Sequence, residues 1–116
     1  LKNTVHVAEF SKEAFHLESV RVFGDPEKQV ERAALCPGSG KSLVGAVLKK
    51  QAQIYITGDI GHHDGIDAVD QGLVIVDAGH FGVEQVFVPW MEEFLKKEFP
   101  DLEILAQKSA GPFQVL

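Results

Sequence analysis

The sequence predicts an α/β fold with a largely parallel or mixed sheet and helices on both faces. Short stretches of β-branched and aromatic residues alternate along the chain with amphipathic stretches, the pattern of strands linked by helices. The stretch at residues 73–76 is fully apolar, as expected for a strand covered on both faces. The 116 residues are 45% hydrophobic and 24% charged, the balance of a globular domain. We therefore expect residues 1–116 to form a single α/β domain.

A helix and a strand are expected before residue 30. Apolar side chains between Phe10 and Leu17 recur at the i, i+4, i+7 spacing of an amphipathic helix, and Ser11 could cap its N-terminus. Residues 20–23 favour a strand, which the turn residues at 24–26 should end.

From residue 30 onward the alternation becomes regular. The expected strands cover residues 30–36, 54–56 and 73–76, and the expected helices cover residues 42–51 and 63–71. Ile66 and Val69 should form the inner face of the second helix. The loops that follow the strands are polar and cover residues 36–41, 57–64 and 77–80. Because ligands gather beyond the carboxyl ends of parallel strands, we expect these loops to share one rim.

The C-terminal part favours a long helix and a last strand. Apolar residues at helical spacing predict a helix that faces the core: Val83, Phe87, Trp90 and Phe94. Pro89 lies inside this stripe and predicts a kink or a break near Val88. Residues 102–106 favour a final strand.

Composition limits the classes of partner. The formal net charge of −6 argues against general nucleic-acid binding and against binding to anionic membranes. No apolar run is long enough for a membrane span, and no export leader is evident. A single cysteine, Cys36, suits a reducing compartment. We therefore expect a cytoplasmic protein.

Histidines and aspartates concentrate between residues 59 and 80, and the sharpest pair lies at the end of this stretch. If a helix begins at His80, then Glu84 lies one turn further along the same face. An imidazole nitrogen and a carboxylate oxygen could then bind one cation. Alternatively, His80 caps the helix and Glu84 is a solvated surface acid. Two ligands alone do not complete a site for zinc or for a harder cation.

A second polar cluster contains Asp59, His62, His63 and Asp64. One of its histidines could face a cation or act as a general acid or base, with an aspartate fixing its tautomer. Asp59 could instead be the N-cap of the following helix. Neighbouring side chains on a helix point in different directions, so His62 and His63 should not both bind one ion.

The glycine-rich loop at residues 36–42 is not a P-loop, because Leu35 stands where that motif needs glycine. Its backbone N–H groups could still face an anion, with Lys41 adding a positive charge. The alternative is a tight turn with a solvated Lys41. Cys36 is expected to be a small buried hydrophobe rather than a nucleophile.

Three motifs together, CPGSGKS, TGDIGHHD and DAGHFGVE, resemble the Nif-three-like family, whose members are also called GTP cyclohydrolase type 2 homologues. The resemblance implies one lobe of a two-lobed α/β protein with a two-metal centre in the cleft and a homohexameric assembly. It implies that His80 and Glu84 are metal ligands from the C-terminal lobe. It also implies that His63 lines the same cavity as a candidate acid or base, while His62 has no assigned role.

The resemblance leaves part of the metal centre outside this chain. The remaining ligands, a paired histidine motif and an aspartate, belong to the N-terminal lobe, and nothing in residues 1–29 resembles them. The chain is therefore expected to be a C-terminal lobe. Zinc, iron and manganese all suit a mixed histidine and carboxylate donor set.

Three functions follow as hypotheses. The first is a contribution to the dinuclear centre of a metal-dependent hydrolase that acts on a nucleotide-like small molecule. The second is a non-catalytic metal-binding interaction or regulatory module. The third, a plain nucleotide-binding domain that uses the turn at 38–40, is disfavoured by the failed P-loop spacing.

Overall fold

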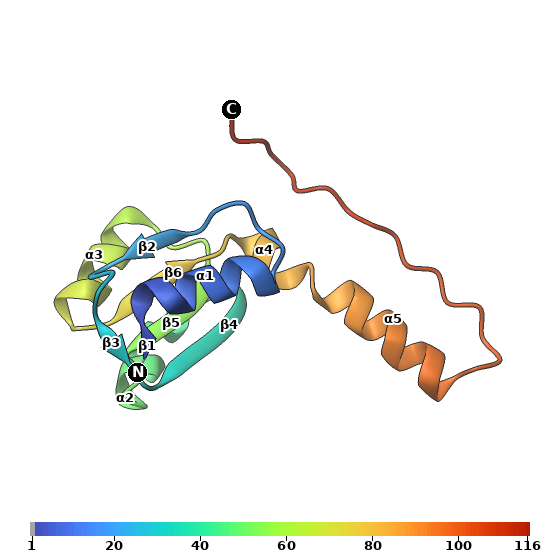
Figure 1. Ribbon diagram of the computed structural model, residues 1–116, viewed down its shortest axis with the longest axis horizontal. Helices are drawn as coiled ribbons and strands as arrows, with labels where there is room; N and C mark the ends of the chain where they lie inside the picture. Colours follow the sequence, from blue (N-terminus) through green and yellow to red (C-terminus); the bar gives the residue numbers. More distant parts are fainter. Residues whose placement is uncertain (1) are drawn as a thin grey trace.

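The computed structural model describes residues 2–116 and contains a four-stranded sheet with the order β2-β6-β5-β4 (Figure 1). Its strands are β2 (Arg21–Phe23), β4 (Ala33–Ser39), β5 (Ile54–Gly58) and β6 (Val74–Asp77). β4, β5 and β6 are parallel, and β2 runs antiparallel to β6 at one edge. A small antiparallel pair joins β1 (Lys2–Asn3) to β3 (Gln29–Val30). The predicted α/β class with a mixed, mostly parallel sheet is confirmed.

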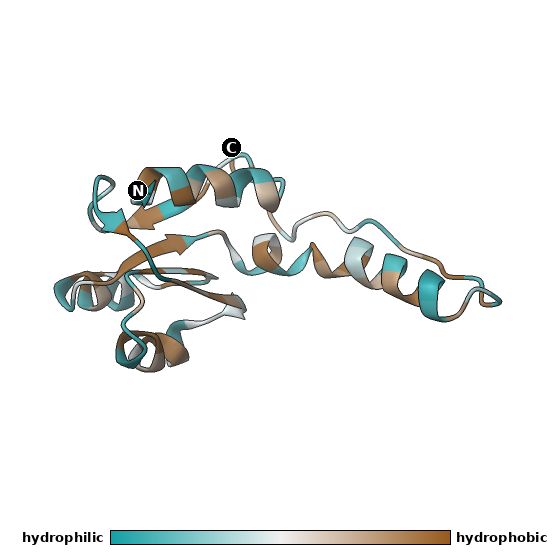
Figure 2. Ribbon diagram, turned by 60° about the horizontal axis from the view of Figure 1, so that its bottom comes forward, coloured by the Kyte–Doolittle hydropathy of each residue, from teal (hydrophilic) through white to brown (hydrophobic). Residues whose placement is uncertain are grey.

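Helices cover both faces of this sheet (Figure 2). The helices are α1 (Thr4–Ala14), α2 (Val44–Lys49), α3 (His62–Asp70), α4 (His80–Glu84) and α5 (Phe87–Glu98), and a 3-10 turn at Lys41–Leu43 precedes α2. Because side chains alternate along a strand, Tyr55 and Ile75 face α2 and α3. Ile54 and Val76 face α1 on the other side. The middle of the sheet is therefore buried on both faces, as its apolar sequence predicts.

The first helix begins earlier than the sequence suggests. Asn3 is its N-cap: the Asn3 side chain accepts a 3.0 Å hydrogen bond from the N–H of His6. Ser11, the predicted cap, lies inside the helix and is buried at 2% exposure. Its hydroxyl donates to the carbonyl of Val7 at 2.8 Å. The prediction of Ser11 as a cap was wrong because its hydroxyl bonds backward to the preceding turn.

Two further expectations need correction in the middle of the chain. β4 continues through the predicted loop at 37–40 as far as Ser39, which pairs with Gly58 across a register shift. The inner face of α3 also differs, because Ile66 is 44% exposed while Gly65 and Ala68 are buried. A Cβ at Gly65 would lie 2.2 Å from a ring carbon of Phe23, so only a residue without a side chain fits there.

Of the predicted core-facing stripe, only Val83 is buried, at 4% exposure in α4, whereas Phe87, Trp90 and Phe94 lie on α5 and do not face the core. α5 has no buried residue and projects away from the sheet (Figure 1). The break falls between α4 and α5, and Pro89 lies in the first turn of α5, where a missing N–H costs little. The predicted strand at residues 102–106 is wrong, because these residues pair with no strand of the described chain.

Among residues 2–116, no helix combines the length and apolar character needed to cross a lipid bilayer.

Candidate functional site

The candidate site begins with a buried carboxylate at the end of β6. Asp77 is 4% exposed, and its two oxygens accept hydrogen bonds from the N–H of Gly79 at 2.9 Å and of Ile60 at 3.1 Å. Arg21 of β2 donates to the same carboxylate at 2.5 Å and to the carbonyl of Ile60 at 3.0 Å. Asp77 is therefore a structural anchor that holds the β6–α4 turn against the loop after β5.

The turn between β6 and α4 depends on two glycines, one in the turn itself and one at the end of β5. Gly79 has a φ of +78°, a conformation that favours glycine. Gly58, at the end of β5, lies against this turn: a Cβ there would be 2.6 Å from the backbone nitrogen of His80. Because Gly58 carries no side chain, the backbone of this turn can approach the end of β5, and this approach places His80 above that strand end.

The imidazole of His80 lies between two carboxylates. Its Nδ1 is 2.8 Å from Oδ2 of Asp59, and its Nε2 is 3.3 Å from Oε1 of Glu84. The three side chains are each about half exposed, so the group opens to solvent. Asp59 reaches the ring from a left-handed backbone conformation with a φ of +56°. Such a φ is uncommon outside glycine, although aspartate tolerates it better than most residues.

Both carboxylates stabilise the charged form of the ring. The hydrogen bond from His80 to Asp59, followed by the charge of Glu84, raises the pKa of His80 above its ordinary value of 6.5. Because Asp59 and Glu84 stabilise the protonated ring, a cation that binds Nε2 of His80 must displace the proton from that nitrogen.

The glycine-rich turn closes one side of this group. Gly38 has a φ of +72°, and a Cβ added there would lie 2.8 Å from Oε1 of Glu84 and 3.4 Å from Nε2 of His80. The hydroxyl of Tyr55 donates to the carbonyl of Gly40 at 2.8 Å and anchors the turn. Burial raises the pKa of Tyr55 to about 12, so this hydroxyl stays a donor at neutral pH. The three loops after the parallel strands therefore share one rim, as predicted.

The pair His80–Glu84 has the separation expected of two ligands to one cation. Donors that bind a tetrahedral cation at about 2.0–2.1 Å lie roughly 3.3 Å apart, and Nε2 and Oε1 are 3.3 Å apart. Asp59, on the opposite ring nitrogen, is placed like the carboxylate that orients a metal-binding histidine. Residues 2–116 contain no group of three or more side chains placed to hold one metal ion. The geometry fits part of a cation site and leaves its other ligands unsupplied.

The residues of the second polar cluster, Asp59, His62, His63 and Asp64, do not form one site, because they contact different side chains. Asp59 contacts His80, and the N-cap of α3 is Gly61, so the interpretation of Asp59 as that cap is wrong. His63 lies on the first turn of α3, and its ring packs edge-on against that of His62 with centroids 5.2 Å apart. Among the described residues, no hydrogen bond or ion pair joins His63 to the ring of His80. The structure places His63 on the same rim but does not bring it into this contact.

Other rim residues have ordinary roles. Lys41 forms an exposed ion pair with Asp64 at 3.9 Å, a contact worth little in water. Cys36 is half-buried and packs against the core, as predicted.

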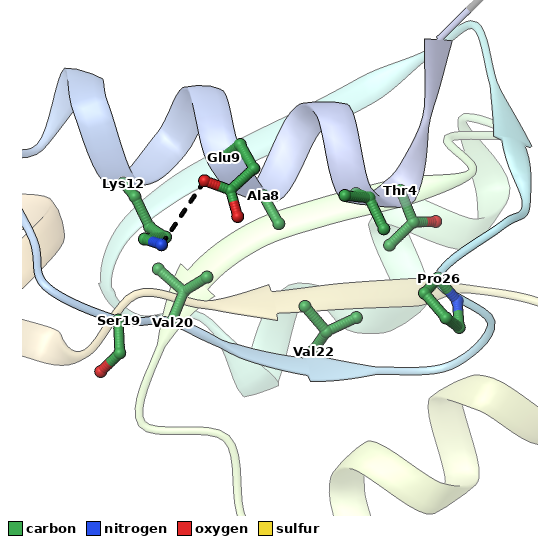
Figure 3. A pocket seen from close by; sticks show the side chains of 9 residues that line it. Thr4, Ala8, Glu9, Lys12, Ser19, Val20, Val22 and Pro26 are labelled. Atoms are coloured by element: carbon green, nitrogen blue, oxygen red, sulfur yellow. Dashed lines mark hydrogen bonds and ion pairs between the residues drawn. The ribbon is translucent and has the colours of Figure 1, made fainter.

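Two of the hollows in the described chain lie close to the sheet, one at the candidate site and one beside α1. One, of about 510 Å³, is lined by Asp59, His80 and Glu84 together with Phe81 and residues 109–113 of the C-terminal segment. Sequence reasoning missed this segment, because nothing in its pattern signals that the chain returns to the rim. The other hollow, of about 220 Å³, lies between α1 and β2 and contains the ion pair of Lys12 with Glu9 (Figure 3). It is lined by no residue of the candidate site.

A family profile described as Duf34/NIF3 (NGG1p interacting factor 3) matches residues 1–112. The chain belongs to the Duf34/NIF3 family. A GTP cyclohydrolase 1 type 2 homolog of Streptococcus pneumoniae is 36% identical to it, across 92% of this chain and 43% of the relative. NIF3-like protein 1 of Homo sapiens is 34% identical across 78% of this chain and 24% of the relative. The predicted family resemblance is confirmed.

Solved structures of Duf34/NIF3-like proteins share the fold. A crystal structure of a hypothetical protein of Staphylococcus aureus superposes with a TM-score of 0.91 and 27% identity, and it covers 99% of this chain and 40% of the longer one. A Bacillus cereus protein related to NIF3 gives a TM-score of 0.88 with 28% identity over 99% of this chain and 33% of its own. The chain therefore spans less than half the length of these relatives and corresponds to one lobe.

Proposed function

We propose that this chain binds a divalent cation through His80 and Glu84 and contributes these ligands to the dinuclear centre of a metal-dependent hydrolase. The observation that carries the proposal is the 3.3 Å separation of Nε2 and Oε1, with Asp59 held 2.8 Å behind the ring. The remaining ligands would come from the part of the relatives that this chain does not span.

In this proposal, residues on the rim formed by the loops after the parallel strands have different roles. A bound cation would activate water for attack and neutralise charge that develops on the substrate. Asp59 orients the imidazole, and Gly38 leaves space beside Glu84. His63, which forms no ion pair within residues 2–116, would hold or deliver a proton at the substrate.

A nucleotide-like small molecule is the substrate class that we propose. The support is the name of the Streptococcus pneumoniae relative, a GTP cyclohydrolase 1 type 2 homolog. The family resemblance also supports a homohexamer in the cytoplasm as the working form, and zinc, iron or manganese as the metal.

The second candidate is a metal-binding interaction or regulatory module without turnover. It is favoured by the small donor set, because residues 2–116 hold no group of three or more ligating side chains. A site that binds a cation weakly can still shape a surface for another protein without performing catalysis.

Zinc titration of this chain by calorimetry tests the metal proposal. We expect His80→Ala and Glu84→Ala each to weaken binding at least about tenfold, and Asp59→Asn to weaken it about 10–100-fold through loss of ring orientation. His62→Ala is the matched control, because it removes a neighbouring exposed histidine with no assigned role, and it should bind zinc as the parent does. Equal binding by the parent and His80→Ala would contradict the proposal.

A second experiment separates catalysis from interaction. This chain is joined to the remaining part of the pneumococcal relative and assayed with GTP and other nucleotides in the presence of zinc, iron or manganese. The hydrolase predicts turnover that His63→Ala abolishes while metal content and assembly persist. Absence of turnover with every metal, in a protein that retains its metal, would favour the regulatory module.

A further inference from the structure

The C-terminal segment returns to the candidate site after α5. The chain turns beyond the end of α5 and runs back toward the rest of the molecule (Figure 1). Residues of the segment 109–113 line the hollow of about 510 Å³ together with His80 and Glu84. Gly111 also lies beside α4, because a Cβ added there would be 3.7 Å from the ring of Phe81. The proposed cation site therefore opens toward this segment.

The return of the segment is shared with a longer protein. Residues 103–116 make up about an eighth of the chain. The superposition on the Staphylococcus aureus crystal structure covers 99% of this chain, and its TM-score of 0.91 requires part of this segment to superpose as well. The path of the segment is therefore a feature of that fold too, although no backbone hydrogen bond within the described chain is recorded for residues 103–116.

The hollow combines a polar group with two aromatic rings. Phe81 comes from α4 and Phe113 from the C-terminal segment, and both line the hollow that contains His80. Phe113 is 77% exposed, and within residues 2–116 the two phenylalanine rings do not stack on each other. Aromatic side chains beside a few polar groups, in a hollow of about 300–1,000 Å³, are the usual surroundings of a small ligand. Flat aromatic faces suit a planar one.

The charges that line the hollow distinguish between the two ends of a nucleotide. Asp59 and Glu84 are carboxylates, and no lysine or arginine of the described chain lines the hollow. A divalent cation bound here would already be balanced by these two charges, so a phosphate would gain little attraction. An uncharged ring meets no repulsion and gains from stacking on aromatic side chains. The hollow therefore suits the ring of a nucleotide better than its phosphates.

We propose that Phe81 and residues 109–113 form the subsite that receives the planar ring of the substrate. This inference rests on the proposed function for the nucleotide-like class of that substrate. The ring lies between Phe81 and Phe113, and Ser109 offers a hydroxyl to its edge. Because few contacts hold the C-terminal segment, binding of the ring also orders residues 109–113.

Binding of inosine, a purine nucleoside without phosphate, tests the subsite in this chain. EDTA is present, so that metal binding plays no role. In an NMR titration, the ring resonances of Phe81, Phe113 and His80 should shift together, and the heteronuclear NOE of residues 109–113 should rise as the segment becomes ordered. Ribose 5-phosphate, which has a sugar and a phosphate but no base, should produce neither change. Absence of a response to inosine, or an equal response to ribose 5-phosphate, overturns the proposal.

Matched variants locate the ring. Phe113→Ala should weaken inosine binding at least about fivefold, the effect of losing one base–aromatic stack, whereas Phe113→Tyr keeps an aromatic face and should bind as the parent does. Phe10→Ala is the control, because it removes a ring of α1 that is 70% exposed and does not line the hollow. A chain that ends at Lys108 keeps every residue of the core clusters and should lose inosine binding.

Zinc calorimetry separates failure of this inference from failure of the metal proposal. A chain that binds inosine but not zinc would support the ring subsite and contradict the metal proposal. A chain that binds zinc but shows no response to inosine overturns the ring subsite alone. Inosine binding that is indifferent to Phe113→Ala and to removal of residues 109–116 overturns it as well, because the ring then lies elsewhere.

Discussion

At the scale of single residues, the position of the His80 ring is set by the carboxylates that contact its two nitrogens. Asp59 comes from the end of β5 and Glu84 from the next turn of α4, so one carboxylate orients the ring and the other faces the open side. The spacing of His80 and Glu84 predicts their contact, because residues four apart share a helix face. The contact with Asp59 spans 21 residues and depends on the register of β5 against β6, which no local pattern encodes.

The protonation of His80 should respond to Asp59 in the metal-free protein. The hydrogen bond to Asp59 is the largest cause of the raised pKa, so Asp59→Asn should lower the pKa of His80, while Glu84 keeps part of the increase. An NMR titration of the imidazole resonances measures this change, and the resonances of His6 provide an internal reference. An unchanged His80 titration in Asp59→Asn would show that this hydrogen bond is absent in solution.

The same shift sets the sign of a pH effect on stability. Because folding raises the pKa of His80, its ion pairs contribute fully below the ordinary value of 6.5 and are lost as pH rises through the raised value. Chemical unfolding of the parent and of Asp59→Asn should therefore differ more at pH 5 than at pH 9. A larger difference at the higher pH would contradict this sign.

A methyl group at Gly38 should disturb both the backbone and Glu84. Gly38→Ala places a side chain at a φ of +72° and a Cβ 2.8 Å from Oε1 of Glu84. We expect a stability loss of about 1–2 kcal/mol and weaker zinc binding, measured by urea unfolding and calorimetry. Gly45→Ala in α2 is the control, because its Cβ meets nothing within 4 Å and alanine favours a helix. Equal zinc binding by both variants would show that Glu84 does not need this space.

At the scale of elements, sequence patterns locate the buried strands well. They misplace the start of α1 and the environment of α5. β5 and β6 are found because each is a short apolar run that must be covered on both faces. α1 is placed too late because its cap is Asn3 and because its first turn alternates apolar and polar residues, with Val5 and Val7 on either side of His6, instead of repeating at helical spacing. The stripe on α5 predicts a helix correctly, but periodicity cannot say whether the surface that covers it lies in the same chain.

The cap of α1 supplies a prediction at this scale. Asn3→Ala removes the acceptor for the N–H of His6 and should reduce the free energy of unfolding by about 1 kcal/mol. Urea unfolding followed by circular dichroism measures the loss. Asn3→Asp keeps a side-chain oxygen at the cap and should stay close to the parent. A similar loss in both variants would indicate that the amide has another role.

At the scale of the whole molecule, the body of the described chain, residues 2–86, and the projecting part that begins with α5 differ in what holds them. Every fully buried side chain lies between Thr4 and Val83, whereas α5 buries none. The rim follows the same division, since Asp77, His80 and Glu84 all belong to the body. The sequence predicts the position of this rim because parallel strands end together. It cannot predict the further ligands that the proposed cation site needs, because residues 2–116 contain no group of three or more side chains placed to hold a metal ion.

Removal of residues 87–116 should therefore leave the body folded. A chain that ends at Val86 keeps the sheet and both core clusters, and we expect its free energy of unfolding to change by about 1 kcal/mol or less. Phe87 and Trp90 line a groove together with Phe15, and loss of their partial burial there accounts for a change of that size. Urea unfolding followed by far-ultraviolet circular dichroism measures both chains. Zinc binding should persist in the shortened chain because its two ligands remain. A non-cooperative transition after truncation would mean that residues 87–116 belong to the core of this lobe.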